Sequence, residues 1–141
     1  MKTLVITFLF LCCMNPNLFA QEKETVTLTI EVSVTKYHKG NILLALYNSE
    51  EDYMEKVYKS STATVKDGKA IIEFKEIAKG NYAFSLFHDV NSNNKLDKNF
   101  FGIPKEPYAF SNNEKGSFGP PKYKKAQFSI HSNKNLNVTI K

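Results

Sequence analysis

The sequence predicts an all-β protein: an antiparallel β-sandwich of about seven strands with Ig-like or transthyretin-like topology, one short helix and one long loop. Two observations lead to this fold class. Several segments alternate apolar and polar residues with a period of two, and turn signals rich in Gly, Asn and Lys separate them. The strands are not separated by the crossover helices that a parallel α/β sheet would require. We therefore expect a single sandwich domain over residues 21–141, a length that suits one core but not two.

Each strand is predicted by its own pattern. Residues 25–35 place apolar side chains at even-numbered positions and polar ones at odd-numbered positions, which is typical of a strand with one buried face. Residues 42–47 are apolar on both faces, as in a central strand. The turn signal KDGK at residues 66–69 predicts a hairpin between the strands on either side of it. The remaining strands are expected at residues 61–65, 70–74, 82–89, 126–130 and 136–140.

A short helix is expected directly after the second strand. Ser49 suits the N-cap position, and Asp52 lies in the first turn, where an acid interacts favourably with the helix dipole. The residues EEDYMEKVY at positions 50–58 then predict two helical turns.

The long loop runs from about residue 98 to residue 122. Loops of this length inside a compact domain are uncommon and are often functional. Its first hydrophobic residues, Phe100, Phe101 and Ile103, are expected to pack as a small satellite core. Rings and amides further along offer a candidate binding surface, formed by Tyr108, Phe110, Asn112 and Asn113.

The first twenty residues predict a secretory signal peptide. Lys2 supplies the positive end, residues 4–14 are apolar, and Ala20 provides a small residue for cleavage. Cleavage after Ala20 would export the protein to the periplasm or the medium and would remove both cysteines, Cys12 and Cys13. We therefore expect neither disulfides nor a transmembrane segment in the mature chain.

The charge pattern excludes nucleic acid as a partner. The chain has nineteen basic and fourteen acidic residues, every basic residue is a lysine, and the two signs are interspersed. Arg, the usual reader of bases and phosphates, is absent. We expect a monomer that binds an unidentified protein or glycan.

The segment DVNSNNKLD at residues 89–97 carries the most specific chemical signal. Oxygen-bearing side chains fall at its positions 1, 3, 5 and 9, and a backbone carbonyl falls at position 7. This spacing wraps a short loop around a hard cation, so the sequence predicts Ca²⁺ rather than Mg²⁺, which needs a stricter octahedron. The predicted ligands are the side chains of Asp89, Asn91, Asn93 and Asp97 and the carbonyl of Lys95.

The loop departs from an EF-hand in two places. Asn94 takes the position that usually holds Gly, and Asn tolerates the left-handed conformation needed there. Phe100 stands where an EF-hand has a bidentate Glu, so further ligands would have to come from Asn99, a downstream oxygen or water. We expect a weak site, with a dissociation constant of roughly 10⁻⁴–10⁻³ M. The alternative is an Asn/Asp-rich turn whose side chains cap the backbone.

Catalysis is not expected. His88 shares a strand face with Phe84 and Leu86, which indicates a hydrogen-bonded residue at the edge of the core rather than a base. No phosphate-binding loop or nucleophile elbow is found. Two alternatives stay open: a small hydrolase with a site under the loop at residues 98–122, and a metal-free structural subunit of an envelope assembly.

Residues 88–113 resemble the signature of a family of exported bacterial proteins, the domain-of-unknown-function family 2141. The run HDVNSNNKLD matches that family's His-Asp-x-Asn-x-Asn/Gly-x-Lys-Leu-Asp, and GIPKE at 102–106 and FSNN at 110–113 follow as in the family. The chain differs at Asn94 and Pro107, where the family often has Gly. The resemblance covers nearly all of the mature chain. It implies an exported β-sandwich with no established reaction.

Overall fold

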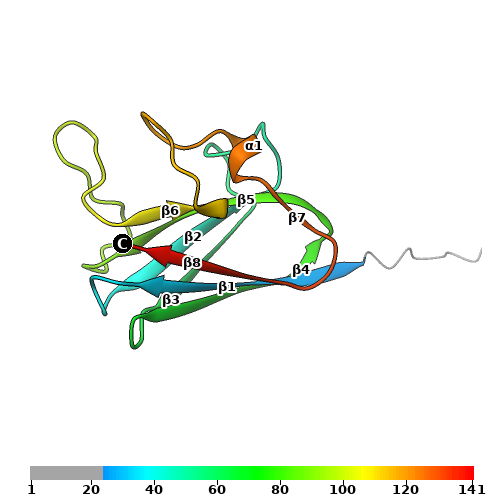
Figure 1. Ribbon diagram of the computed structural model, residues 1–141, viewed down its shortest axis with the longest axis horizontal. Helices are drawn as coiled ribbons and strands as arrows, with labels where there is room; N and C mark the ends of the chain where they lie inside the picture. Colours follow the sequence, from blue (N-terminus) through cyan, green and yellow to red (C-terminus); the bar gives the residue numbers. More distant parts are fainter. Residues whose placement is uncertain (1–23) are drawn as a thin grey trace, which may run out of the picture.

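A computed structural model describes residues 24–141, and the predicted signal peptide lies outside these described residues. Two β-sheets face each other and confirm the predicted sandwich (Figure 1). The first sheet has the order β4 (Lys69–Ala78), β1 (Thr25–Val34), β8 (Lys134–Ile140). The second has the order β3 (Lys59–Thr64), β2 (Asn41–Tyr47), β5 (Gly80–Asp89), β6 (Tyr108–Phe110), and β7 (Phe128–Ile130) also pairs with β5.

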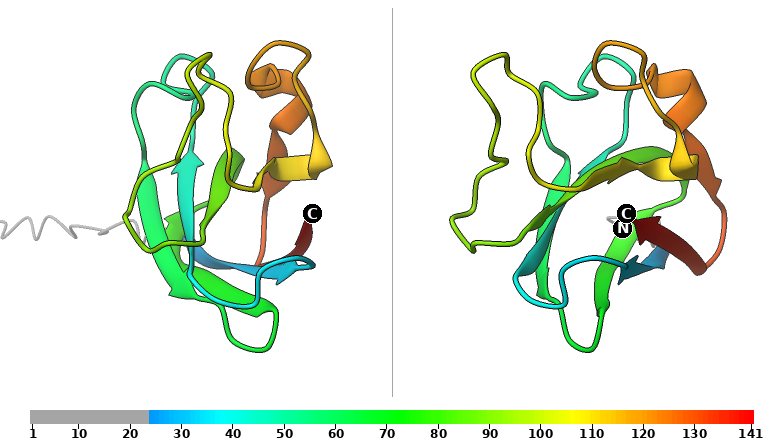
Figure 2. Two further views of the ribbon diagram at one scale, coloured as in Figure 1. Left: turned by 90° about the vertical axis from the view of Figure 1, so that its left-hand side faces the viewer. Right: turned by 60° about the vertical axis from the view of Figure 1, so that its left-hand side comes forward.

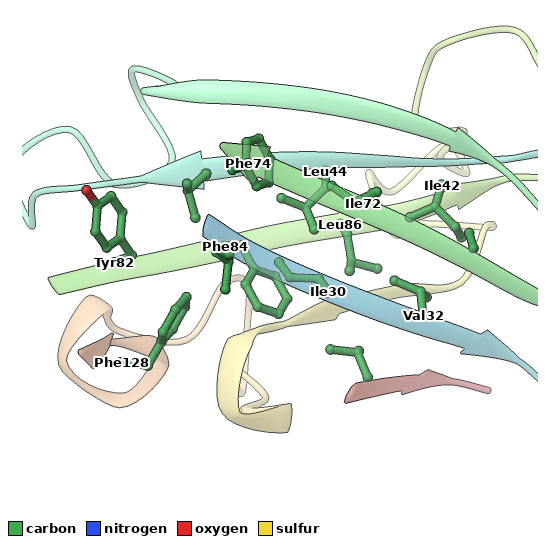
Figure 3. Close-up of a cluster of buried hydrophobic side chains, with 14 of the residues drawn as sticks. Ile30, Val32, Ile42, Leu44, Ile72, Phe74, Tyr82, Phe84, Leu86 and Phe128 are labelled. Atoms are coloured by element: carbon green, nitrogen blue, oxygen red, sulfur yellow. The ribbon is translucent and has the colours of Figure 1, made fainter. Parts of the chain in front are cut away.

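The core between the sheets follows from the period-two alternation of the strands. In β1 the even-numbered residues Leu28, Ile30 and Val32 are fully buried, and the odd-numbered residues between them are only half-buried. Figure 3 shows side chains of both sheets meeting in this layer, among them Ile30 and Phe84. Burying one such side chain contributes about 1.5–3 kcal/mol. The layer therefore holds the two sheets together.

One strand pair departs from the expected antiparallel arrangement. β8 runs parallel to β1, with Ile30 opposite Leu136 and Val32 opposite Val138, whereas the other pairs are antiparallel. These are the first and last strands of the described chain, so β4 and the entire second sheet lie in the connection between them. A parallel pair needs a long connection, and here strands rather than a helix provide it.

The prediction of a helix at residues 50–58 is wrong. Ser49 does accept a hydrogen bond from the Asp52 N–H at 3.1 Å, but the segment forms a single turn. Met54 has φ 66°, in the left-handed region, and so the helix cannot continue. The helical residues lie elsewhere, in η1 (Ser111–Asn113) and in α1 (Tyr123–Ala126), which precedes β7.

The long loop is also more structured than expected, because it contains β6 and η1, and α1 follows it directly. Figure 1 shows α1 and the connections around β6 on the outer side of the five-stranded sheet, away from β1 and β8. Ala83 of β5 packs there against Tyr123 and Ala126, with Tyr53 at the edge of the cluster. Within residues 24–141, no helix combines the length and the apolar character needed to cross a bilayer.

Candidate functional site: the loop after strand β5

The loop at residues 89–97 begins at the last residue of β5. Asp89 is completely buried, and its two carboxylate oxygens accept hydrogen bonds from the N–H groups of Asn93 and Asn94 at 3.0 and 2.8 Å. Ser92 and Asn94 have φ values of 58° and 61°, so the backbone turns left-handed twice. Asn94 thus adopts the conformation predicted for it. The chain curls back onto the Asp89 carboxylate.

Asp97 closes the loop from its other end. Its two oxygens accept hydrogen bonds from the side-chain amides of Asn91 and Asn93 at 2.7 and 3.1 Å. Lys95 joins the network through its N–H, which donates to the Asn93 side-chain oxygen at 2.8 Å. The structure therefore brings the five predicted ligand residues into one short hydrogen-bonded loop.

Sequence reasoning missed Glu106, which holds both ends of this loop. Its carboxylate accepts hydrogen bonds from the N–H groups of Val90 at 3.0 Å and Asp97 at 3.1 Å. The side chain is buried, and the neighbouring Lys105 N–H donates to the Asp97 carbonyl at 2.7 Å. The sequence carried only a general indication of this residue. A downstream oxygen was expected to complete the loop, but no particular residue could be named.

The charges of the loop lack basic partners. Asp89 and Glu106 are buried carboxylates, yet no lysine among residues 24–141 forms a salt bridge with them or with Asp97. Nor does this part of the chain contain a group of three or more His, Cys, Asp or Glu side chains placed to hold a metal ion. A cation in this loop would therefore depend on the amide oxygens of Asn91 and Asn93. Each amide could present oxygen instead of nitrogen to such a cation by rotating.

The Asn99 side chain stabilises the hairpin tip at residues 98–104 and, within the described chain, forms no hydrogen bond with the 89–97 loop. Its side-chain oxygen accepts hydrogen bonds from the N–H groups of Phe101 and Ile103 at 2.9 and 3.0 Å. The expectation that Phe100, Phe101 and Ile103 form a satellite core is wrong, because their side chains are 97%, 82% and 59% exposed. The tip closes on its own backbone, with Lys98 bridged to Pro104 and the Asn99 N–H donating to the Ile103 carbonyl at 2.8 Å.

The predicted binding surface is divided between two roles. Tyr108, Phe110 and Asn113 line a groove of about 770 Å³ that also touches Asn137 and Thr139 of β8. Tyr108 is half-exposed, whereas Phe110 is buried. Asn112 serves the fold instead. Its amide donates to the carbonyls at positions 125 and 127, both at 2.9 Å, and so braces α1.

His88 lies at the edge of the core, as predicted. It is 1% exposed, and its Nε2 forms a hydrogen bond of 2.7 Å with the Lys39 carbonyl. The hydrolase alternative would therefore need a base other than His88, because this ring nitrogen is already engaged in the interior.

A comparison with protein families gives a match over most of the described fold. The family described as "Uncharacterized protein conserved in bacteria (DUF2141)" matches residues 30–139. The matched segment includes the whole loop at 89–97 and Glu106. No match was found among curated proteins or among solved structures.

Proposed function

The chain belongs to the DUF2141 family of bacterial proteins, and we propose that it is an exported, non-enzymatic β-sandwich module whose 89–97 loop binds Ca²⁺. The cation stabilises the loop, and the module binds a protein, a glycan or another component of the cell envelope. Export rests on the predicted signal peptide at residues 1–20. The ligands are the side chains of Asp89, Asn91, Asn93 and Asp97 and the carbonyl of Lys95.

The observation that carries the proposal is a buried carboxylate without a basic partner. Buried charges in proteins are normally paired or bound to a metal. Asp89 is fully buried and receives only backbone N–H groups, while Asp97, the other acid of the loop, receives only neutral amides. A divalent cation among these side chains would compensate both charges. Oxygen ligands of this type suit Ca²⁺.

The groove beside β6 supports the binding role. Tyr37 and Tyr108 supply aromatic rings, and Asn113 and Asn137 supply amides, which together suit a polar partner with an apolar face. Lys105 also lines the groove and follows the loop directly, its N–H bonded to Asp97. Order in the loop is therefore linked to the shape of the groove.

Calcium binding is tested by thermal unfolding of residues 21–141, which contain both sheets and the complete core. The melting temperature is measured in excess EDTA, in millimolar Ca²⁺ and in millimolar Mg²⁺. A ligand in tenfold excess over its dissociation constant stabilises the folded state by about 1.4 kcal/mol. For a domain of this size we expect Ca²⁺ to raise the melting temperature by several degrees, and Mg²⁺ by less.

Two matched variants locate the effect. Asp97→Asn keeps the side-chain shape but removes one carboxylate charge, and we expect it to lose most of the calcium shift. Asp67→Asn makes the same change in the exposed turn between β3 and β4, where φ is 49°, and should keep the full shift. An unchanged melting temperature for the wild-type protein in Ca²⁺ would leave the loop as an Asn/Asp turn. The metal-free structural subunit would then be favoured.

A further inference from the structure

Two loop tips carry fully exposed aromatic side chains. Phe100 and Phe101 are 97% and 82% exposed at the first tip, and Phe118 is fully exposed at the second. Ile103 beside the first tip is 59% exposed. Isolated apolar residues on a surface need no explanation, but several gathered on one face mark an interaction site.

Both tips are ordered by their own backbone contacts. Asn99 fastens the first tip through the hydrogen bonds to Phe101 and Ile103 described above. In the second tip a Cβ added at Gly116 would lie 1.8 Å from the carbonyl oxygen of Gly119, so the backbone at these two positions of the turn is in close contact. The phenyl rings are therefore held outward by folded turns.

The two tips lie on the same face of the molecule. In both views of Figure 2 the connections that contain them rise from the same side of the molecule, beyond the five-stranded sheet. An apolar hollow of about 240 Å³ lies between them and is lined by both. Its lining residues include Leu96, Gly102, Pro104, Gly119 and Pro120.

The net positive charge of the protein is concentrated in the same part of the chain. Residues 98–125 carry six lysines and two glutamates, a net charge of +4. The other described residues carry eleven lysines and eleven acids, a net charge of zero. One of the two glutamates, Glu106, is buried and bonded to the backbone, so the exposed surface here is more basic still.

We propose that this face, formed by Phe100, Phe101, Ile103 and Phe118 and called the aromatic tip face below, docks onto an anionic lipid bilayer. The rings enter the interfacial region, and the surrounding lysines contact lipid phosphates. Single rings protruding from separate tips suit a bilayer, which deforms around them, better than the flat surface of a protein partner. The inference deepens the proposed function by naming the partner, and it requires no bound Ca²⁺.

Vesicle co-sedimentation of residues 21–141 tests the proposal. Phosphatidylcholine vesicles with and without phosphatidylglycerol are compared, each in Ca²⁺ and in EDTA. We expect binding to the anionic vesicles that weakens at high salt. Phe100→Ser combined with Phe101→Ser should lower the partition coefficient roughly tenfold or more. Ile71→Ser removes a 60% exposed apolar side chain from β4, in the other sheet, and should leave binding unchanged.

A fluorescence measurement gives an independent readout. The chain has no tryptophan, so Phe101→Trp introduces a single fluorophore at the tip and Ile71→Trp a single fluorophore on the other sheet. Insertion predicts a blue shift with anionic vesicles for Phe101→Trp and none for Ile71→Trp.

The proposal is overturned if the wild-type protein does not bind anionic vesicles, or if the serine variant binds equally well. It is also overturned if the tips instead mediate self-association that the serine variant abolishes. A calcium shift in melting without vesicle binding would reject this inference alone.

Discussion

A single carboxylate, that of Glu106, joins the two ends of the 89–97 loop. Glu106→Gln replaces one of its oxygens with an amide nitrogen, which cannot accept a hydrogen bond from a backbone N–H. One of the N–H groups of Val90 and Asp97 therefore loses its partner near the protein interior. We expect the free energy of unfolding to fall by about 1–3 kcal/mol, measured by urea denaturation.

The matched control for this change is Glu73→Gln on β4. Glu73 is exposed, and the nearest lysine nitrogen, that of Lys75, lies 3.7 Å away. Exposed ion pairs contribute about 0–1 kcal/mol, so this variant should unfold close to the wild-type urea concentration. Equal midpoints for the two variants would show that the Glu106 carboxylate does not stabilise the loop.

The contrast between Asp97 and Glu106 shows what the sequence could predict about single residues. The ligand spacing from Asp89 to Asp97 is local, so one segment of sequence was sufficient to find it. Glu106 acts on that loop only because the intervening tip turns back, and no spacing rule describes such a turn. The exposure of Phe100 was misjudged for the same reason: whether a loop side chain is buried depends on where the tip points.

At the scale of elements, the turn before β2 is tightly coupled to the end of β5. Gly40 has φ +92°, and an added Cβ would lie 2.3 Å from the Asp89 carbonyl oxygen. Gly102 has φ +78°, but nothing lies within 4 Å of its added Cβ. Gly102→Ala should cost about 1–2 kcal/mol, the ordinary strain of a left-handed alanine. Gly40→Ala adds a backbone clash, so we expect a larger loss in thermal unfolding and a smaller calcium shift. Equal losses would contradict this coupling.

The positions of the strands were predicted better than the pairing of the strands or the positions of the helices. The alternation in β1 depends only on its own residues, because each side chain faces either the core or the outside. The parallel pairing of β1 with β8 depends on how the whole chain between them folds, which local patterns do not record. Ser49 forms the expected capping hydrogen bond with the Asp52 N–H, yet the left-handed backbone at Met54 ends the segment after one turn.

At the scale of the whole molecule, the apolar core and the proposed functional features lie in different parts of the fold. The apolar core lies between the sheets, whereas the 89–97 loop, the aromatic tips and the basic excess of residues 98–125 lie in and beyond the connections around β6. Substitutions at exposed tip residues should therefore change binding while leaving the core unchanged. This separation makes the vesicle and calcium experiments interpretable, since the variants retain the layer that holds the fold together.

The stability of the whole molecule should fall at alkaline pH because of tyrosines that are buried or half-buried. Burial, and then the neighbouring Tyr47, raise the pKa of Tyr53 from 10.0 to about 12. Burial also raises the pKa of Tyr82 and of Tyr123. The folded state therefore holds these protons more tightly than the unfolded state. The contribution of this proton binding to stability is complete below pH 10, and it is lost as the pH rises from 10 to about 12.

Tyr53→Phe separates this contribution from other alkaline effects. The Tyr53 hydroxyl is buried and has no hydrogen-bond partner among the described residues, so its removal should stabilise the protein by about 1 kcal/mol at neutral pH. It should also reduce the fall in stability above pH 10, measured as urea midpoints over a pH series. Tyr108→Phe removes the hydroxyl of a half-exposed side chain and should follow the wild-type profile. If Tyr53→Phe loses stability with pH as steeply as the wild-type protein, the other buried tyrosines account for the alkaline transition.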